Sequence, residues 1–198
     1  MTLPGQLALC FALLFASSFP ATAQHRDGNA MLDPSGSART TAVSPYAGME
    51  RRAVKALSEQ QIADLKAGRG MSLALAAELN GYPGPVHVLE LADALQLTHE
   101  QRSQIQALFE AMKIETISIG ERILAEEMSL DRLFAEKGVT KLFLEGATAR
   151  IGAAQGALRS AHLRYHLAMV DLLPPTQIAH YAKLRGYVPS GPHQHHSR

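Results

Sequence analysis

The chain has 198 residues, 46% of them hydrophobic, which is enough for one domain with a buried core. Its 19 lysines and arginines against 18 acidic residues leave a net charge of +1, so nothing favours binding to nucleic acid or to an anionic membrane. Aromatic residues make up 6% and tryptophan is absent, which also excludes the usual stacking platform for single strands. We therefore expect no nucleic-acid partner.

The first 23 residues have the pattern of an export signal. The apolar run LALCFALLFASSF is too short to span a bilayer comfortably, and Ala21 to Ala23 supply the small residues that a signal peptidase needs. Cleavage after Ala23 would remove Cys10, the single cysteine, and with it any disulfide or thiol site. The sequence predicts an exported chain without membrane insertion after signal removal, with an uncleaved anchor as the alternative.

Composition then divides the rest of the chain into three parts. Residues 24–45 mix Gly, Ser, Pro and charge without periodicity, which predicts a flexible arm. Residues 46–187 carry helical periodicity and predict one all-α domain. Residues 188–198 predict a disordered tail that contains histidines.

Short helices are expected first in the domain. Ser58, with Gln61 as its capping partner, predicts the start of a helix that Gly68 ends. A second short helix is expected to end at Asn80 and Gly81. Pro85 suits the first position of a third helix, which we expect to continue through VHVLELADALQL.

The pentapeptide LTHEQ predicts the start of a long helix. Thr98 can accept a hydrogen bond from the backbone N–H of Gln101, whose side chain can reach back to the Thr98 N–H. Leu97 occupies the position of a hydrophobic staple just before this cap.

Two long helices follow, each with apolar residues near a seven-residue spacing and no proline. Gly138 is expected to end the first helix and Thr140 to cap the second. Helices joined by so short a turn should form an antiparallel hairpin. No alternating pattern of β-strands competes, so the expected fold is all-α: a long helical hairpin with short flanking helices.

A candidate metal site lies on the second long helix. His162, His166 and Met169 share one face, and two imidazoles four residues apart can chelate Zn, Ni, Co or Cu. Pairing across the hairpin places Glu115 opposite His162 as a further ligand. The alternative is that the two histidines are packing residues beside the helix seam.

The tail offers a second set of metal-binding side chains, His193, His195 and His196, without a fixed geometry. The chain has no spacing typical of a catalytic motif, and adjacent acids such as Glu126 and Glu127 point in different directions from one helix. We therefore expect a binding protein that is not an enzyme and needs no cofactor.

An export signal, a long helical hairpin and LTxxQ at a helix start resemble the Spy/CpxP or LTXXQ-motif family of periplasmic proteins, whose metal-resistance relatives are ZraP and CnrX. The first motif matches fully as Leu97, Thr98 and Gln101. The second keeps Leu173 and Gln177 but has Pro174 in place of threonine.

The resemblance implies a periplasmic homodimer with one of two roles. One is an ATP-independent chaperone that binds unfolded or misfolded envelope proteins, or an adaptor that restrains a stress-sensor domain. The alternative is a metal-binding sensor or resistance protein, in which the ligands would be the residues named above.

Overall fold

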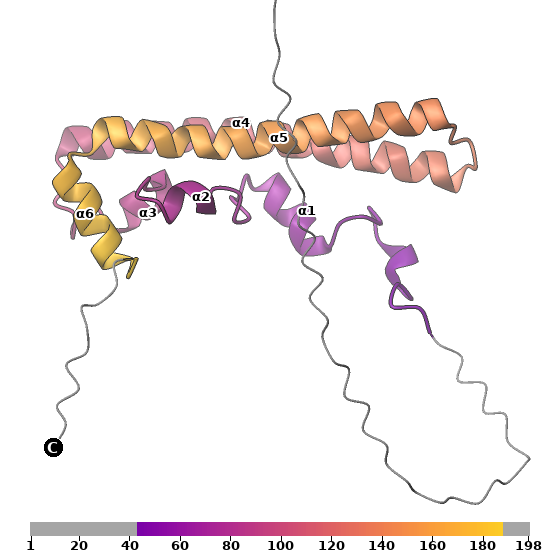
Figure 1. The fold of residues 1–198 in the computed structure, drawn as a ribbon, viewed down its shortest axis with the longest axis horizontal. Coiled ribbons are helices and arrows are strands. Elements are labelled where there is room, and N and C mark those ends of the chain that lie inside the picture. The colour runs from indigo at the N-terminus through magenta and orange to yellow at the C-terminus, as the bar shows by residue number, and fades with distance from the viewer. Residues whose placement is uncertain (1–42, 188–198) are drawn as a thin grey trace, which may run out of the picture. The chain divides into compact units, whose positions relative to one another are not determined.

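The computed structural model describes residues 43–187, which form helices and turns without a β-strand (Figure 1). This confirms the all-α prediction for that part of the chain. The predicted signal peptide, most of the predicted arm and the tail with His193, His195 and His196 lie outside the described residues. Among residues 43–187, none of the helices has the length and apolar character needed to cross a bilayer.

Two long helices dominate the fold. Helix α4 spans His99–Ala135, helix α5 spans Lys141–Leu172, and the two lie side by side (Figure 1). Ion pairs join them, Glu126 to Arg150 at 2.9 Å and Glu115 to Arg164 at 2.5 Å. The described chain also contains a 3-10 turn, four shorter helices and their connections: η1 at Met49–Arg51, α1 at Glu59–Lys66, α2 at Leu75–Glu78, α3 at Pro85–Glu90 and α6 at Pro175–Leu184.

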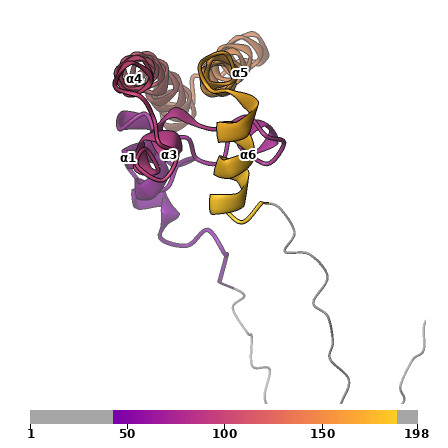
Figure 2. The same ribbon diagram turned by 90° about the vertical axis from the view of Figure 1, so that its left-hand side faces the viewer.

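The shorter helices form a second layer against the long pair. In the view along the long helices, α1 and α3 lie beneath α4, and α6 lies beneath α5 (Figure 2). Two buried clusters hold the layers together. The first is formed by Val88, Ala92, Leu95, Leu97, Ile105, Met169, Leu173 and Tyr181, and the second by Leu65, Ile123, Leu124, Ala154 and Leu158.

The predicted helix starts are confirmed. Ser58 with Gln61, and Thr98 with Gln101, each form a reciprocal capping box, and the Thr140 hydroxyl accepts from the Phe143 N–H. These bonds satisfy backbone donors that the first turn of a helix leaves free.

Two predicted helix ends are wrong. Helix α3 ends at Glu90, because residues 91–97 fold into tight turns that bury Leu95 and Leu97 in the first cluster. Helix α4 ends at Ala135, and the residue that leaves the helical path is Lys137, with φ 55°, rather than Gly138. Burial of Leu95 and Leu97 thus decides the end of α3, where the apolar pattern suggested a longer helix, and the turn at Lys137 decides the end of α4, where Gly138 suggested a later one.

Gly120 marks the closest approach between the layers. A Cβ at this position would overlap sterically with the Leu65 carbonyl oxygen. It would also lie 3.0 Å from the Leu65 carbonyl carbon. Both belong to backbone, which cannot move aside as a flexible side chain can. The absence of a side chain at residue 120 is therefore what lets α1 pack on α4.

We expect Gly120→Ala to lower the free energy of unfolding by about 2 kcal/mol or more, because α1 must shift away from α4. The matched control is Gly152→Ala in α5, where a Cβ meets no atom within 4 Å. That change should raise stability by up to about 1 kcal/mol through helix propensity. Urea unfolding of both variants measures this, and equal effects would contradict the proposed close packing.

Candidate functional site

The two pentapeptide motifs meet at one end of the molecule. Their leucines, Leu97 and Leu173, are buried in the same hydrophobic cluster. Their glutamines bond to each other, since Gln101 Nε2 donates to Gln177 Oε1 at 2.9 Å and Gln177 Nε2 donates to Gln101 Oε1 at 3.3 Å. The motifs therefore form a junction between the start of α4 and the start of α6.

Each glutamine also satisfies a backbone carbonyl. Gln101 donates to the Leu172 oxygen at 3.2 Å, and Gln177 donates to the Leu95 oxygen at 3.1 Å. Pro174 is the residue before α6 and provides no side-chain cap, as the sequence implied. The second motif nevertheless keeps its contacts, because its glutamine acts across the junction and not on its own helix start.

A buried carboxylate lies next to this junction. Glu78, at the end of α2, is 5% exposed and accepts the Gly84 N–H at 3.0 Å. The hydroxyls of Tyr181 and Tyr187 both donate to Glu78 Oε1, the second at 3.0 Å. One side chain thus connects α2, the α2–α3 turn and α6.

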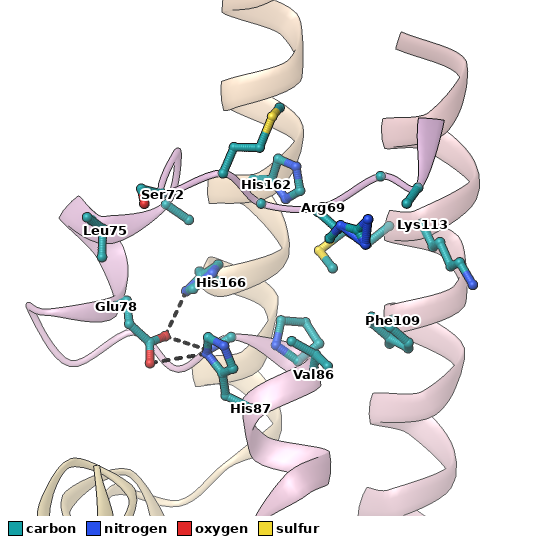
Figure 3. Close-up of a pocket in the computed structure, with 18 residues that line it drawn as sticks. Arg69, Ser72, Leu75, Glu78, Val86, His87, Phe109, Lys113, His162 and His166 are labelled. Carbon is teal, nitrogen blue, oxygen red and sulfur yellow. Dashed lines mark hydrogen bonds and ion pairs between the residues drawn. The ribbon is translucent and has the colours of Figure 1, made fainter. Parts of the chain in front are cut away.

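Two histidines and an arginine surround the same carboxylate. His87 Nδ1 lies 3.4 Å from Oε1 and His166 Nδ1 lies 3.7 Å from Oε2 (Figure 3). The His87 Nδ1 contact is long and lacks hydrogen-bond geometry. His166 Nδ1 donates instead to the Tyr82 oxygen at 2.7 Å, and Arg185 Nε reaches to 3.9 Å from Oε1.

These contacts set the charge state of Glu78. Burial by itself raises the pKa of a carboxyl group, but the His87 contact and the tyrosine hydrogen bonds outweigh burial and lower the pKa of Glu78 to about 2. Burial and the bond to Glu78 raise the pKa of Tyr181, so its hydroxyl keeps the proton that it donates. The cluster is therefore a charged carboxylate held by neutral and cationic donors.

The predicted metal ligands do not converge. His162 and His166 are both buried on α5, but Met169 is buried in the first hydrophobic cluster. Glu115 lies opposite Arg164 and Tyr165, which both bond to it, rather than opposite His162. The Arg164 hydrogen bond lowers the pKa of Glu115, so this carboxylate is engaged as an anion on the surface.

Within residues 43–187, no three or more His, Cys, Asp and Glu side chains are grouped so as to hold a metal ion. The tail histidines lie outside the described residues, so metal binding stays a prediction of the sequence.

The sequence did not single out Glu78 or His87. For Glu78, the sequence offers one indication of burial, since this glutamate has small and apolar neighbours in AAELNG on a short helix. The partners of Glu78 are up to 109 residues away along the chain, which no local pattern reveals.

The cluster borders a cavity of about 550 Å³ (Figure 3). Its walls come from the 67–75 segment, the start of α3 and the facing sides of α4 and α5. Glu78, His87, His162 and His166 all belong to the lining, which is otherwise largely apolar.

No family model matches the chain, and the comparisons with curated proteins and with solved structures found no match.

We expect Glu78 to make stability depend on pH. Its pKa is about 2 when folded and 4.5 ordinarily, so the unfolded chain binds more protons between these values. Its contribution, roughly 3 kcal/mol, is complete above about pH 4.5 and is lost as the pH falls toward about 2. Urea unfolding across this window should show a smaller pH dependence for Glu78→Gln than for the unaltered protein. If the free energy of unfolding depended equally on pH in both proteins, Glu78 would not be the group responsible.

Proposed function

We propose that this protein is a periplasmic, ATP-independent chaperone or envelope-stress adaptor of the Spy/CpxP kind, which binds exposed segments of other proteins. The observation that carries the proposal is the apolar far end of the long helix pair. Buried apolar residues of α4 stop at Leu124 and those of α5 begin at Ala147. The apolar residues between them have no buried core of their own.

This end, which we name the apolar tip, has four large exposed side chains. They are Met128, Phe134, Leu142 and Phe143, which are 56%, 49%, 76% and 58% exposed. Leu130, Leu133 and Leu144 are half-buried beside them in sequence. Solvated apolar side chains gathered in one region favour association with another protein surface, because their burial releases free energy.

The charges around the tip suit a partner without strong net charge. Three acids and three bases are interspersed there: Asp131, Arg132, Glu136, Lys137, Lys141 and Glu145. Balanced charge supplies no selective attraction for nucleic acid or anionic lipid. Exposed apolar segments of unfolded or misfolded proteins, or of a stress-sensor domain, fit this surface better.

The metal-sensor alternative receives less support. Met169 and Glu115, two of its four predicted ligands on the long helices, are engaged by the hydrophobic cluster and by Arg164 respectively. The exposed tip needs no metal to bind an apolar segment.

We also propose that the protein is a homodimer whose two copies bury the outer face of α5. That face has exposed Leu167 and Val170, and Gly152 and Gly156 lie in open space where a second backbone could approach. Sedimentation equilibrium should give twice the monomer mass, and Gly156→Lys should give the monomer. A monomeric unaltered protein would contradict this arrangement.

We expect the purified protein to suppress aggregation of reduced α-lactalbumin, measured by light scattering, with a chelator present and no ATP. Replacing Leu142 and Phe143 together by serine should raise the concentration for half-suppression by about tenfold, because less apolar area is buried on the client.

The matched control is Ile114→Ser, which removes an exposed apolar side chain, 72% exposed, from the middle of α4. It should leave suppression unchanged. No suppression by the unaltered protein would refute the chaperone role, and equal loss in both variants would refute the assignment to the tip.

A further inference from the structure

The cavity occupies a break in the hydrophobic core. The first buried cluster contains Ile105 and Met169, and the second contains Ile123 and Leu158. Between them on the same two helices stand Met112 and His162, which both line the cavity. A continuous core would have filled this interval with packed aliphatic side chains, so the interruption needs an explanation.

The lining is suited to a small aromatic molecule. A volume of about 550 Å³ falls in the range of small-molecule sites, and the walls are mainly apolar. Met71, Met112 and Phe109 supply two thioethers and a ring, and these side chains make favourable contacts with aromatic groups. Figure 3 shows Phe109 and Val86 on the same side of the cavity, across from His162 and His166.

Two ring nitrogens of the lining, His87 Nδ1 and His162 Nε2, lack a hydrogen bond in the described chain, and of these His87 Nδ1 lies 3.4 Å from the Glu78 carboxylate. His162 is 3% exposed, and its Nε2 is buried without a hydrogen bond in the described chain. Burial, with a contribution from His166, lowers the pKa of His162, so the ring is neutral at pH 7. A neutral imidazole has one donor and one acceptor nitrogen, and leaving either unpaired in a buried site costs free energy.

The ring can present a nitrogen to the cavity. A Cβ on Gly70 would lie 3.9 Å from both Nδ1 and Cε1 of His162, so this edge of the ring faces the Gly70 segment that lines the cavity. A half-turn of the ring exchanges the positions of Cε1 and Nε2. Either orientation therefore places a nitrogen on the cavity side.

The segment beside the ring has an unusual backbone. Met71 and Ser72 have φ of 43° and 63°, in the left-handed region that residues with side chains seldom adopt. Both residues line the cavity, together with Gly68 and Gly70. The chain thus bends around the cavity at two consecutive non-glycine residues. Like the unpaired nitrogen of His162, this bend is a feature that core packing alone does not require.

The polar surroundings select the head group. Glu78 contributes a carboxylate to the same wall, and this carboxylate is ionised at neutral pH. An anionic ligand would meet its repulsion and also lose hydration in an apolar site. A hydroxyl group carries no charge and can either donate to or accept from a neutral imidazole, whichever tautomer is present.

We propose that the cavity is a binding site for a phenol, with its aromatic body against Met71, Met112 and Phe109 and its hydroxyl hydrogen-bonded to His162. The site is separate from the apolar tip, so the proposal is independent of the protein-binding function. It also gives a role to the segment before α3, which the long helices alone would not need.

The test is titration of the purified full chain with 2-naphthol, followed by the fluorescence of the ligand. The unaltered protein has no tryptophan, so its ligand signal is observed without that background, and the two tryptophan variants described below carry the same added background and are compared with each other. We expect saturable binding of one molecule per chain. Naphthalene, which lacks the hydroxyl, and 2-naphthoate, which is an anion, should both bind more weakly.

His162→Phe should weaken 2-naphthol binding about tenfold and leave naphthalene binding unchanged, because only the hydrogen bond is lost. A second pair of variants does not depend on altering a buried residue. Leu75→Trp, at a lining residue that is 48% exposed, should obstruct the cavity and weaken both ligands. Leu79→Trp, on an exposed neighbour outside the lining, should weaken neither.

Three outcomes would overturn the proposal. Binding of 2-naphthol that does not saturate would show that no defined site exists. Equal affinity for 2-naphthol and naphthalene would show that the hydroxyl forms no hydrogen bond with His162. Equal effects of Leu75→Trp and Leu79→Trp would place the ligand elsewhere.

Discussion

The buried carboxylate of Glu78 is the interaction on which the arrangement of the short helices depends. It receives hydrogen bonds from the Gly84 N–H and from Tyr181 and Tyr187, while His87 and His166 approach from α3 and α5. A buried charge is tolerated only when it is fully compensated. Each of these elements must therefore keep its place for the carboxylate to remain satisfied, and together they fix α2, α3 and α6 against α5.

The short helices held by Glu78 cover one end of the long helix pair and leave the other end exposed. At the covered end, the Gln101 and Gln177 side chains bond to each other above the first hydrophobic cluster. At the other end, beyond Leu124 and Ala147, the long helices have no buried apolar residues between them and the turn. The two buried clusters thus stop short of the turn, which leaves exposed side chains at that end free for contact with a partner.

Local features of the fold could be read from the sequence, because they depend on residues within one turn. The caps at Ser58, Thr98 and Thr140 are examples, and the seven-residue apolar spacing indicated the long helices. Features set by distant residues could not. The role of Gly120 is one example, because it comes from the Leu65 backbone of another element. Glu115 was placed opposite His162, although Arg164 and Tyr165 hold it.

The candidate sites follow the same division. Exposed Leu142 and Phe143 lie beside a predicted turn, so their position at the end of the long pair could be anticipated. The cavity could not, since its walls come from segments that are adjacent only after folding. The four-residue spacing of His162 and His166 suggested a metal site. In the structure, both histidines line the cavity, and His166 lies near the Glu78 carboxylate.

The central claim is that Glu78 fixes the short helices on the long pair, and native-state hydrogen exchange tests it most directly. In Glu78→Gln the side-chain amide nitrogen cannot accept the hydrogen bonds that the carboxylate accepts. The account predicts that amides of α2, α3 and α6 lose protection while the middle of α4 and α5 keeps it. Unchanged protection in the short helices, or an equal loss throughout residues 43–187, would contradict it.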